Sequence, residues 1–194
     1  MAVLSMYIIA DVILLTFFMI EIFARDSKEA KKVIKTKFEK GSTDIAGFII
    51  VISSLTIIVA PLLNYFNLLP FSLGLSAFII GPILAVAGVI VRTVGMLTLG
   101  RFYTRTLQKT DNHVLVTDGI YKYLRHPGYA GTIFIFLGAS LTTGSILSFV
   151  LVTLLILLTY LYRIHVEEKM LVKIFGEQYI VYKKHSKRII PFIY

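Results

Sequence analysis

The chain changes from polar to apolar within one short stretch, Tyr123-Leu124-Arg125-His126-Pro127-Gly128-Tyr129-Ala130-Gly131. Pro127 suits the first turn of a helix, where a missing backbone N–H costs nothing, and it disfavours helical backbone at His126. We therefore expect His126 at a helix N-terminus, where free N–H groups and the helix dipole attract an anion. Gly128 and Gly131 leave bare backbone that a ligand can approach closely. A plain helix cap at a membrane edge explains the same residues, so this stretch alone does not decide between binding and capping.

Apolar residues dominate the rest of the sequence. Of its 194 residues, 57% are hydrophobic and only 16% are charged, whereas a soluble domain is about half apolar and about a quarter charged. The apolar residues gather in long runs, which indicates an integral membrane protein. The net charge of +9 comes from basic residues that flank these runs, which favours membrane lipids over nucleic acid as the partner. The absence of cysteine excludes a disulfide, a thiol nucleophile and a thiolate metal site.

Five apolar segments are candidate membrane spans, because about 20 residues at 1.5 Å each cross a bilayer. They cover about residues 2–24, 45–63, 72–97, 127–141 and 146–162, of which the fourth is short. An uncharged turn at 142–145 joins the last two, which are therefore expected to form a helical hairpin. The helical pattern continues to about Phe175-Gly176, and a further helix is expected from Glu177 to about Lys187. The predicted fold is all-α: five transmembrane helices, a cytoplasmic cofactor-binding loop and a C-terminal helix.

Basic residues predict the orientation of these spans. The loop at 25–44 carries seven Lys and Arg residues, whereas the links at 64–71 and 142–145 carry none. Cytoplasmic loops are rich in Lys and Arg, so we expect the N-terminus outside and the C-terminus and the 98–128 connection in the cytoplasm. Residues 27–38 are expected either as an interfacial amphipathic helix or as a solvated loop. A basic patch in the last helix is expected to contact headgroups: Lys183, Lys184, Lys187 and Arg188.

Glycines recur every seven residues in the third span, at Gly74, Gly81, Gly88 and Gly95. Small residues at this spacing form a flat helix face on which another helix packs closely. Arg92, near the inner end of the same span, is expected to snorkel towards water.

Polar residues of the cytoplasmic side form a candidate site. The residues are His113, Tyr121, His126, Tyr129, Arg163 and Glu167, beside an apolar wall of Val114-Leu115-Val116. Their mixed charges suit a small zwitterionic, nucleotide-like ligand, although a surface ion pair between positions i and i+4 also explains Arg163 and Glu167. The sequence has no Gly-rich dinucleotide loop, Walker motif or helical zinc motif. The residues therefore predict a polar ligand at the inner membrane face, and no metal.

Three motifs follow one another in the C-terminal half. They are His113-Val114-Leu115-Val116-Thr117-Asp118-Gly119-Ile120-Tyr121, then Arg125-His126-Pro127-Gly128-Tyr129-Ala130-Gly131, then Arg163…Glu167-Glu168…Leu171…Phe175-Gly176…Tyr179…Tyr182. In this combination they resemble the isoprenylcysteine carboxyl methyltransferase family, and much of the pattern is shared with the related membrane phospholipid methyltransferases. The resemblance covers about residues 100–191, and the second motif alone would not be specific.

The resemblance implies S-adenosylmethionine as methyl donor and S-adenosylhomocysteine as product. The positions that would bind this cofactor are His113, Val114, Leu115, Val116, Tyr121, His126, Pro127, Gly128, Tyr129 and Glu167. Arg163 would bind the carboxylate of a lipophilic acceptor such as a prenylcysteine or a prenylated protein C-terminus. Arg163, Glu167 and Glu168 are the expected catalytic residues. An N-terminal three-helix membrane region, 1–99, would then precede a catalytic region, 100–194.

Methyl transfer to a carboxylate fits what the sequence supplies. An α-carboxylate with a pKa of about 3.5 is already ionised at neutral pH, so no general base is required and positioning dominates. Arg163 suits a bidentate grip on a carboxylate. Three alternatives stay open: N-methylation of a phospholipid amine, a sterol-type NADPH reductase that shares the second motif, and a membrane scaffold without activity.

Overall fold

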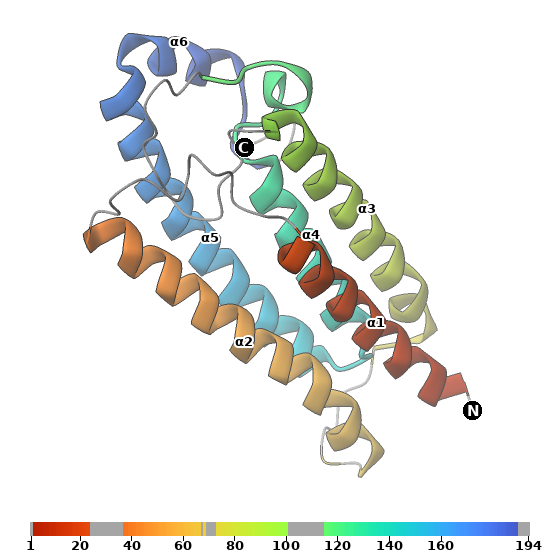
Figure 1. Ribbon diagram of the computed structural model, residues 1–194. Helices are drawn as coiled ribbons and strands as arrows, with labels where there is room; N and C mark the ends of the chain where they lie inside the picture. Colours follow the sequence, from red (N-terminus) through yellow and green to blue (C-terminus); the bar gives the residue numbers. More distant parts are fainter. Residues whose placement is uncertain (1, 24–36, 67, 69–72, 101–114, 190–194) are drawn as a thin grey trace.

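The computed structural model describes residues 2–23, 37–66, 68, 73–100 and 115–189. The regular secondary structure in these ranges is helical. They contain one isolated parallel bridge, between Leu124 and Lys187, and no strand. The elements are α1 (Ala2–Phe23), α2 (Lys37–Tyr65), α3 (Leu75–Leu99), the 3-10 helix η3 (Gly119–Lys122), α4 (Pro127–Thr142), α5 (Ile146–Phe175) and α6 (Glu177–His185). Helices α1 to α5 lie side by side as a bundle, and α6 crosses one end of it (Figure 1).

Several helices have the length and composition of membrane spans. Within the described ranges, Gly41–Asn64, Leu75–Leu99 and Ile146–Phe175 are long and apolar enough to cross a bilayer, and Pro127–Thr142 is a shorter apolar helix. Large apolar side chains such as Phe48 point outwards and are exposed, as expected for a bundle whose solvent is lipid. The predicted all-α, integral membrane class is confirmed.

Helix boundaries follow the sequence except where polar residues extend a helix. The expected loop at 25–44 is wrong for its last residues, since α2 already begins at Lys37, while the apolar part of α2, Gly41–Asn64, agrees with the expected span at about 45–63. Apolarity marks only the part of a helix that suits lipid, and residues 37–44 contain no proline that would stop the helix earlier. Residues 27–36 of the expected interfacial helix lie outside the described residues. At the other end of the chain, α5 ends before Gly176, whose φ of 56° favours glycine, and α6 ends two residues earlier than expected.

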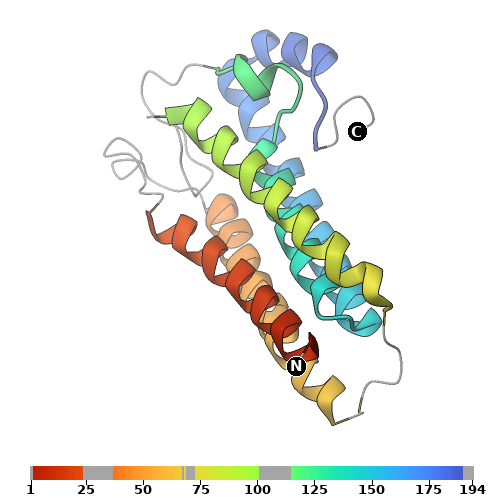
Figure 2. The same ribbon diagram turned by 90° about the vertical axis from the view of Figure 1, so that its right-hand side faces the viewer.

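The glycine face of α3 packs against α4 (Figure 2). A Cβ at Gly81 would lie 2.7 Å from the Gly138 carbonyl oxygen, and one at Gly88 would lie 2.6 Å from the Gly131 carbonyl oxygen. The predicted close packing is therefore confirmed for three of the four glycines, since a Cβ at Gly95 would lie 3.1 Å from the Pro127 side chain. Gly74 precedes the helix and faces open space, so it is not part of this face.

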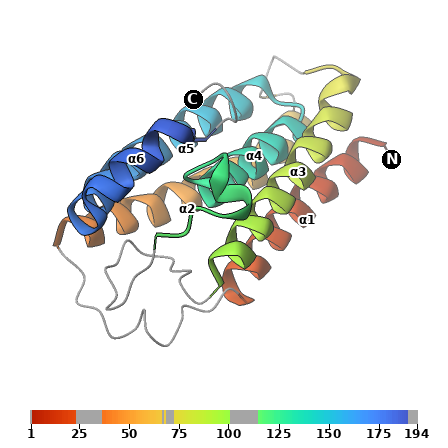
Figure 3. The same cartoon turned by 90° about the horizontal axis from the view of Figure 1, so that it is seen from above.

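Seen from above, η3 and α6 lie over one end of the bundle (Figure 3). The predicted hairpin between α4 and α5 is present: Thr142 ends α4, and Ser145 caps α5 by accepting a hydrogen bond from the Ser148 backbone N–H. The start of α4 and the end of α5 therefore lie at the same end of the molecule, beneath η3 and α6. This arrangement brings the second and third sequence motifs together.

Candidate functional site

His126 lies at the start of α4, between two acidic residues of α5. It is the residue before Pro127, in the N-cap position, and its side chain is buried. Its Nδ1 is 3.3 Å from Glu167 Oε2, and its Nε2 is 3.6 Å from Glu168 Oε1. Burial lowers the pKa of His126, but the carboxylates of Glu167 and Glu168 raise it by more. The net shift is upwards, so the ring keeps its positive charge to a higher pH than a free histidine.

The backbone that leads into His126 is held by the segment after α6. The Arg125 N–H donates to the Lys187 carbonyl at 2.7 Å, and the His126 N–H donates to the Arg188 carbonyl at 3.1 Å. In return, the Lys187 N–H donates to the Tyr123 carbonyl at 2.9 Å. These bonds join two segments about sixty residues apart and fix the turn that enters α4.

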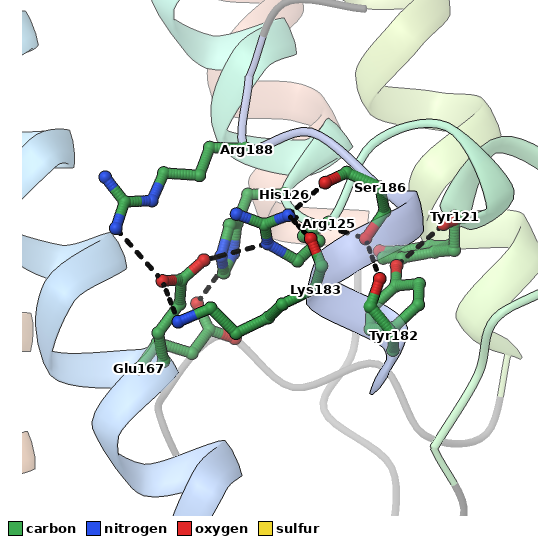
Figure 4. Close-up of polar contacts among 9 residues, drawn as sticks. Tyr121, Arg125, His126, Glu167, Tyr182, Lys183, Ser186 and Arg188 are labelled. Carbon is green, nitrogen blue, oxygen red and sulfur yellow. Dashed lines mark hydrogen bonds and ion pairs between the residues drawn. The ribbon is translucent and has the colours of Figure 1, made fainter. Parts of the chain in front are cut away.

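Three basic side chains surround Glu168 in what we call the Glu168 cluster: Arg125, Glu168, Lys183 and Arg188. The three basic members are labelled in Figure 4. The Arg125 Nε donates to Glu168 Oε1 at 2.9 Å, while Lys183 Nζ and Arg188 Nη2 each lie 3.3 Å from Oε2. Arg125 also donates to the Ser186 carbonyl. Glu168 thereby connects α5, the entry to α4 and the segment after α6. The expectation that the whole basic patch faces headgroups is wrong for Lys183 and Arg188, because this buried carboxylate attracts both.

Glu167, Tyr129 and Arg163 form a second group with His126, which we call the Arg163 site. The His126 and Tyr129 rings are stacked, with centroids 5.6 Å apart and planes 5° apart. The buried Arg163 donates from Nη2 to the Tyr129 hydroxyl at 3.3 Å, and its guanidinium lies 5.4 Å from the centre of that ring. Its Nη1 donates to the Ser42 carbonyl of α2 at 3.3 Å. The site therefore runs from Glu167 through the stacked rings of His126 and Tyr129 to the buried guanidinium of Arg163.

Two buried polar atoms of this site suit a ligand. Glu167 Oε2 and His126 Nε2 have no hydrogen-bond partner in the described part of the chain. Glu167 Oε2 lies 3.3 Å from His126 Nδ1, and His126 Nε2 lies 3.6 Å from Glu168 Oε1. Both are ion-pair distances without hydrogen-bond geometry. Buried polar groups normally form hydrogen bonds, so a ligand with an amino group and an acceptor would satisfy both. The residues present therefore fit the zwitterionic cofactor that the sequence predicts.

The first motif is described only in part. His113 and Val114 lie outside the described residues. Leu115 lines an open groove of about 650 Å³ between the approach to η3 and α6, together with Thr117, Lys122, Glu177, Gln178, Val181, Tyr182 and His185. Val116 is half-buried and Tyr121 is buried. The Tyr182 hydroxyl donates to the Tyr121 carbonyl at 2.7 Å, and burial raises the pKa of Tyr182 to about 12, so this hydroxyl stays protonated.

Comparison with known proteins decides the family. A family model described as phospholipid methyltransferase matches residues 76–178, which is more than half of the chain. The chain belongs to the phospholipid methyltransferase family. The matched residues run from α3 to the start of α6 and include His126, Arg163 and Glu167, whereas α1 and α2 lie outside them.

Within this family the similarity is to isoprenylcysteine methyltransferases, as the sequence motifs indicate. Protein-S-isoprenylcysteine O-methyltransferase of Xenopus laevis is 37% identical over 117 residues, 59% of this chain and 41% of the relative. The Saccharomyces cerevisiae protein of the same name is 35% identical over 117 residues, 59% of this chain and 49% of the relative. The solved structure of a eukaryotic intramembrane Ras methyltransferase, isoprenylcysteine carboxyl methyltransferase, matches with a TM-score of 0.61 and 27% identity, covering 83% of this chain and 55% of that chain. The chain spans about half the length of these relatives.

Arg92 departs from the sequence expectation. It does not snorkel: its side chain is buried, forms an ion pair with Glu21 of α1, and donates to the Gly128 carbonyl at 2.9 Å. Arg92 follows Gly88 by four residues and precedes Gly95 by three, so it lies on the glycine face that packs against α4. This spacing is the sequence signal that indicates burial of Arg92. Nothing in the sequence indicated Glu21 as its partner.

The structure also shows how the remaining predicted positions lie. Pro127 is buried against Gly95 of α3, and Gly128 presents its carbonyl to Arg92. His126, Tyr129, Arg163, Glu167 and Glu168 are brought together, while Tyr121 and Leu115 lie towards α6. Their roles in binding and catalysis stay predictions.

Proposed function

We propose that this family member is an S-adenosylmethionine-dependent methyltransferase that methylates the carboxylate of a prenylated cysteine or a similar lipophilic acceptor. The observation that carries the proposal is the Arg163 site, which holds a buried arginine, an acid with one buried oxygen and a buried histidine of raised pKa within one group of contacts. Its residues lie inside the stretch 76–178 matched by the family model, and relatives named protein-S-isoprenylcysteine O-methyltransferase are similar to this chain over 59% of its length. S-adenosylmethionine supplies a methyl group on a sulfonium and leaves as S-adenosylhomocysteine.

The chain's own residues would bind the two charged ends of this donor. Glu167 Oε2, which is buried without a hydrogen-bond partner in the described ranges, suits the donor's amino group. The raised pKa of His126 favours its charged form beside the first N–H groups of α4, and both groups favour the donor's carboxylate. The proposed donor site continues from His126 along Pro127, Gly128 and Tyr129. The residues proposed to contact the apolar part of the donor are Leu115, Val116 and Tyr121. His113 and Val114 complete the proposed cofactor set.

Arg163 is proposed to hold the acceptor. Its guanidinium stays charged at any physiological pH and presents several N–H donors in a plane, which fits two carboxylate oxygens. The acceptor is already an anion, so no residue needs to remove a proton, and the protein accelerates transfer by alignment. Tyr129 contacts both Arg163 and His126, and so connects the proposed acceptor and donor positions. Glu168 is proposed as a positioning residue, since its contacts are with basic side chains of the protein.

We further propose that α1 to α5 all cross the membrane, with the N-terminus outside and the site at the cytoplasmic face. The links at 64–71 and 142–145 carry no Lys or Arg, whereas the opposite end of the bundle carries α6 and its lysines. A water-soluble donor would then reach the site from the cytoplasm, and a lipid-dissolved acceptor would reach it between helices. Residues 1–99 would form the membrane region and 100–194 the catalytic region.

The direct test is methyl transfer by the purified protein in lipid nanodiscs. Labelled S-adenosylmethionine is supplied with either a short prenylcysteine compound or a phospholipid amine, and NADPH is titrated separately. We expect label in a base-labile ester of the prenylcysteine compound. Transfer to the lipid amine alone would instead support N-methylation, which the description of the family favours. Binding of NADPH without methyl transfer would support the reductase alternative, and binding of neither cofactor would support a scaffold.

A further inference from the structure

An ion pair between the buried Arg92 and the partly exposed Glu21 joins α1 to α3. Arg92 Nη2 contacts Glu21 Oε1, and the Arg92 side chain is only 9% exposed. The Phe17 ring of α1 lies 5.4 Å from the same guanidinium and packs edge-on against Phe136 of α4, with ring centroids 5.2 Å apart. Removing two charges from water is costly, and ionisable residues at membrane depth are usually functional. This pair therefore calls for a role beyond holding helices together.

Arg92 uses its other amino group to hold the first turn of α4. Its Nη1 donates to the Gly128 carbonyl at 2.9 Å and to Thr132 Oγ1 at 2.6 Å. The Thr132 hydroxyl in turn donates to the same Gly128 carbonyl at 3.0 Å. Gly128 lies between His126 and Tyr129, so one guanidinium and one hydroxyl fix the backbone that carries both rings.

The close packing of α3 and α4 makes these bonds short. A Cβ at Gly131 would lie 2.6 Å from the Arg92 Cβ and 2.7 Å from its backbone nitrogen. Arg92 therefore starts directly beside α4, and its guanidinium reaches the first turn only because Gly131 has no side chain. Glu21 holds Nη2 from the side of α1 while Nη1 points at Gly128, so the ion pair helps to set the direction of the guanidinium.

We propose that Glu21 and Arg92 are positioning residues for the reaction: they hold His126 and Tyr129 in register with Arg163 and Glu167. The proposal rests on the proposed function. It also makes α1, which lies outside the residues matched by the family, part of what shapes the donor site. Without the Glu21 carboxylate, Arg92 loses its charged contact on the side of α1, and its Nη1 is expected to hold the Gly128 carbonyl less firmly.

The test compares Glu21→Gln and Thr132→Val with a matched control, Thr16→Val. Thr16 also donates its hydroxyl to the carbonyl four residues before it, at 2.8 Å, but it lies exposed on α1. Calorimetric titration of the folded, purified proteins with S-adenosylmethionine is expected to give a donor Kd about tenfold higher for Glu21→Gln and Thr132→Val. Thr132→Ser, which restores the hydroxyl, is expected to restore the Kd, and Thr16→Val to leave it unchanged.

The outcomes separate this inference from the proposed function. If wild-type protein binds the donor and both variants bind it equally well, the pair only stabilises the fold and the inference is wrong, whatever happens to Tm. A Thr132→Ser variant that stays as weak as Thr132→Val would also overturn it. If wild-type protein binds no donor at all, the proposed function fails, and the positioning role falls with it.

Discussion

Glu167 and Glu168 are neighbours in the sequence, yet the two regions around them differ in kind. In the Glu168 cluster, three basic side chains from three segments lie within 3.3 Å of one carboxylate. In the Arg163 site, Glu167 Oε2 is buried without a hydrogen-bond partner among the described residues, and Arg163 donates to two neutral oxygens at 3.3 Å. The first region uses its charges to hold the protein together. We propose that the second holds its charged groups for the methyl donor and the acceptor.

The largest expected effect is on catalysis at Arg163. Arg163→Ala removes the group proposed to hold the acceptor carboxylate, and we expect methyl transfer to fall by about 10³-fold or more. The measurement is the initial rate with labelled donor and saturating prenylcysteine compound. Arg163→Lys is the control: it keeps a charge but loses the two-point grip, so it should retain only a small part of the activity. Wild-type rates in Arg163→Ala would remove Arg163 from the reaction.

The next effect is on stability at Glu168. Glu168→Gln leaves Arg125, Lys183 and Arg188 beside a neutral group, and breaking a buried ion pair in this way costs about 3–5 kcal/mol. We expect a clear loss of Tm in detergent, measured by intrinsic tyrosine fluorescence or static light scattering. A Tm equal to that of the wild type would show that the cluster does not hold α6 and the entry to α4 together.

Glu167→Gln is the matched substitution one residue earlier, and it is expected to act in the opposite way. The Tm should fall less than in Glu168→Gln, because Glu167 loses one ion-pair contact, the one with His126 at 3.3 Å, whereas Glu168 loses its contacts with three basic side chains. The donor Kd should rise about tenfold, the loss of one charged hydrogen bond of about 1.4 kcal/mol. If Glu167→Gln lowered Tm as much as Glu168→Gln, the contrast between the two regions would disappear.

The smallest expected effect is on the pH dependence of fold stability. We attribute this dependence to His126, which contacts both acids. Its pKa is raised above the ordinary value of 6.5 in the folded protein. Its charged contacts therefore stabilise the fold fully below about pH 6.5, and this contribution is lost as the pH rises through the raised pKa. We expect Tm to fall over that interval in the wild type and to fall less in His126→Gln. Equal slopes in the two proteins would mean that His126 does not carry the dependence.

The bundle could be predicted because lipid-facing helices leave a simple pattern. Long apolar runs marked every helix from α1 to α5, and the glycine spacing marked the face of α3 that meets α4. The start of α2 was missed because its first turns are polar, and Arg92 was placed at the surface because its register on the glycine face was overlooked. Burial at such a face overrides the tendency of a long basic side chain to reach water.

The site was predictable to the extent that its residues stand in local motifs. His126 before Pro127 and Arg163 four residues before Glu167 gave the helix start and the helix face. The Glu168 cluster was not predictable, because it depends on backbone bonds between residues 123–126 and 187–188 that no local pattern specifies. Glu21 was missed for the same reason: its partner lies 71 residues away.

The central claim is that donor and acceptor are bound by different residues of one site, Glu167 for the donor and Arg163 for the acceptor. Titration of wild type, Glu167→Gln and Arg163→Ala with S-adenosylmethionine by calorimetry tests it most directly. We predict that the donor Kd rises about tenfold in Glu167→Gln and stays near the wild-type value in Arg163→Ala. An equal loss of donor affinity in both variants would contradict this division of roles.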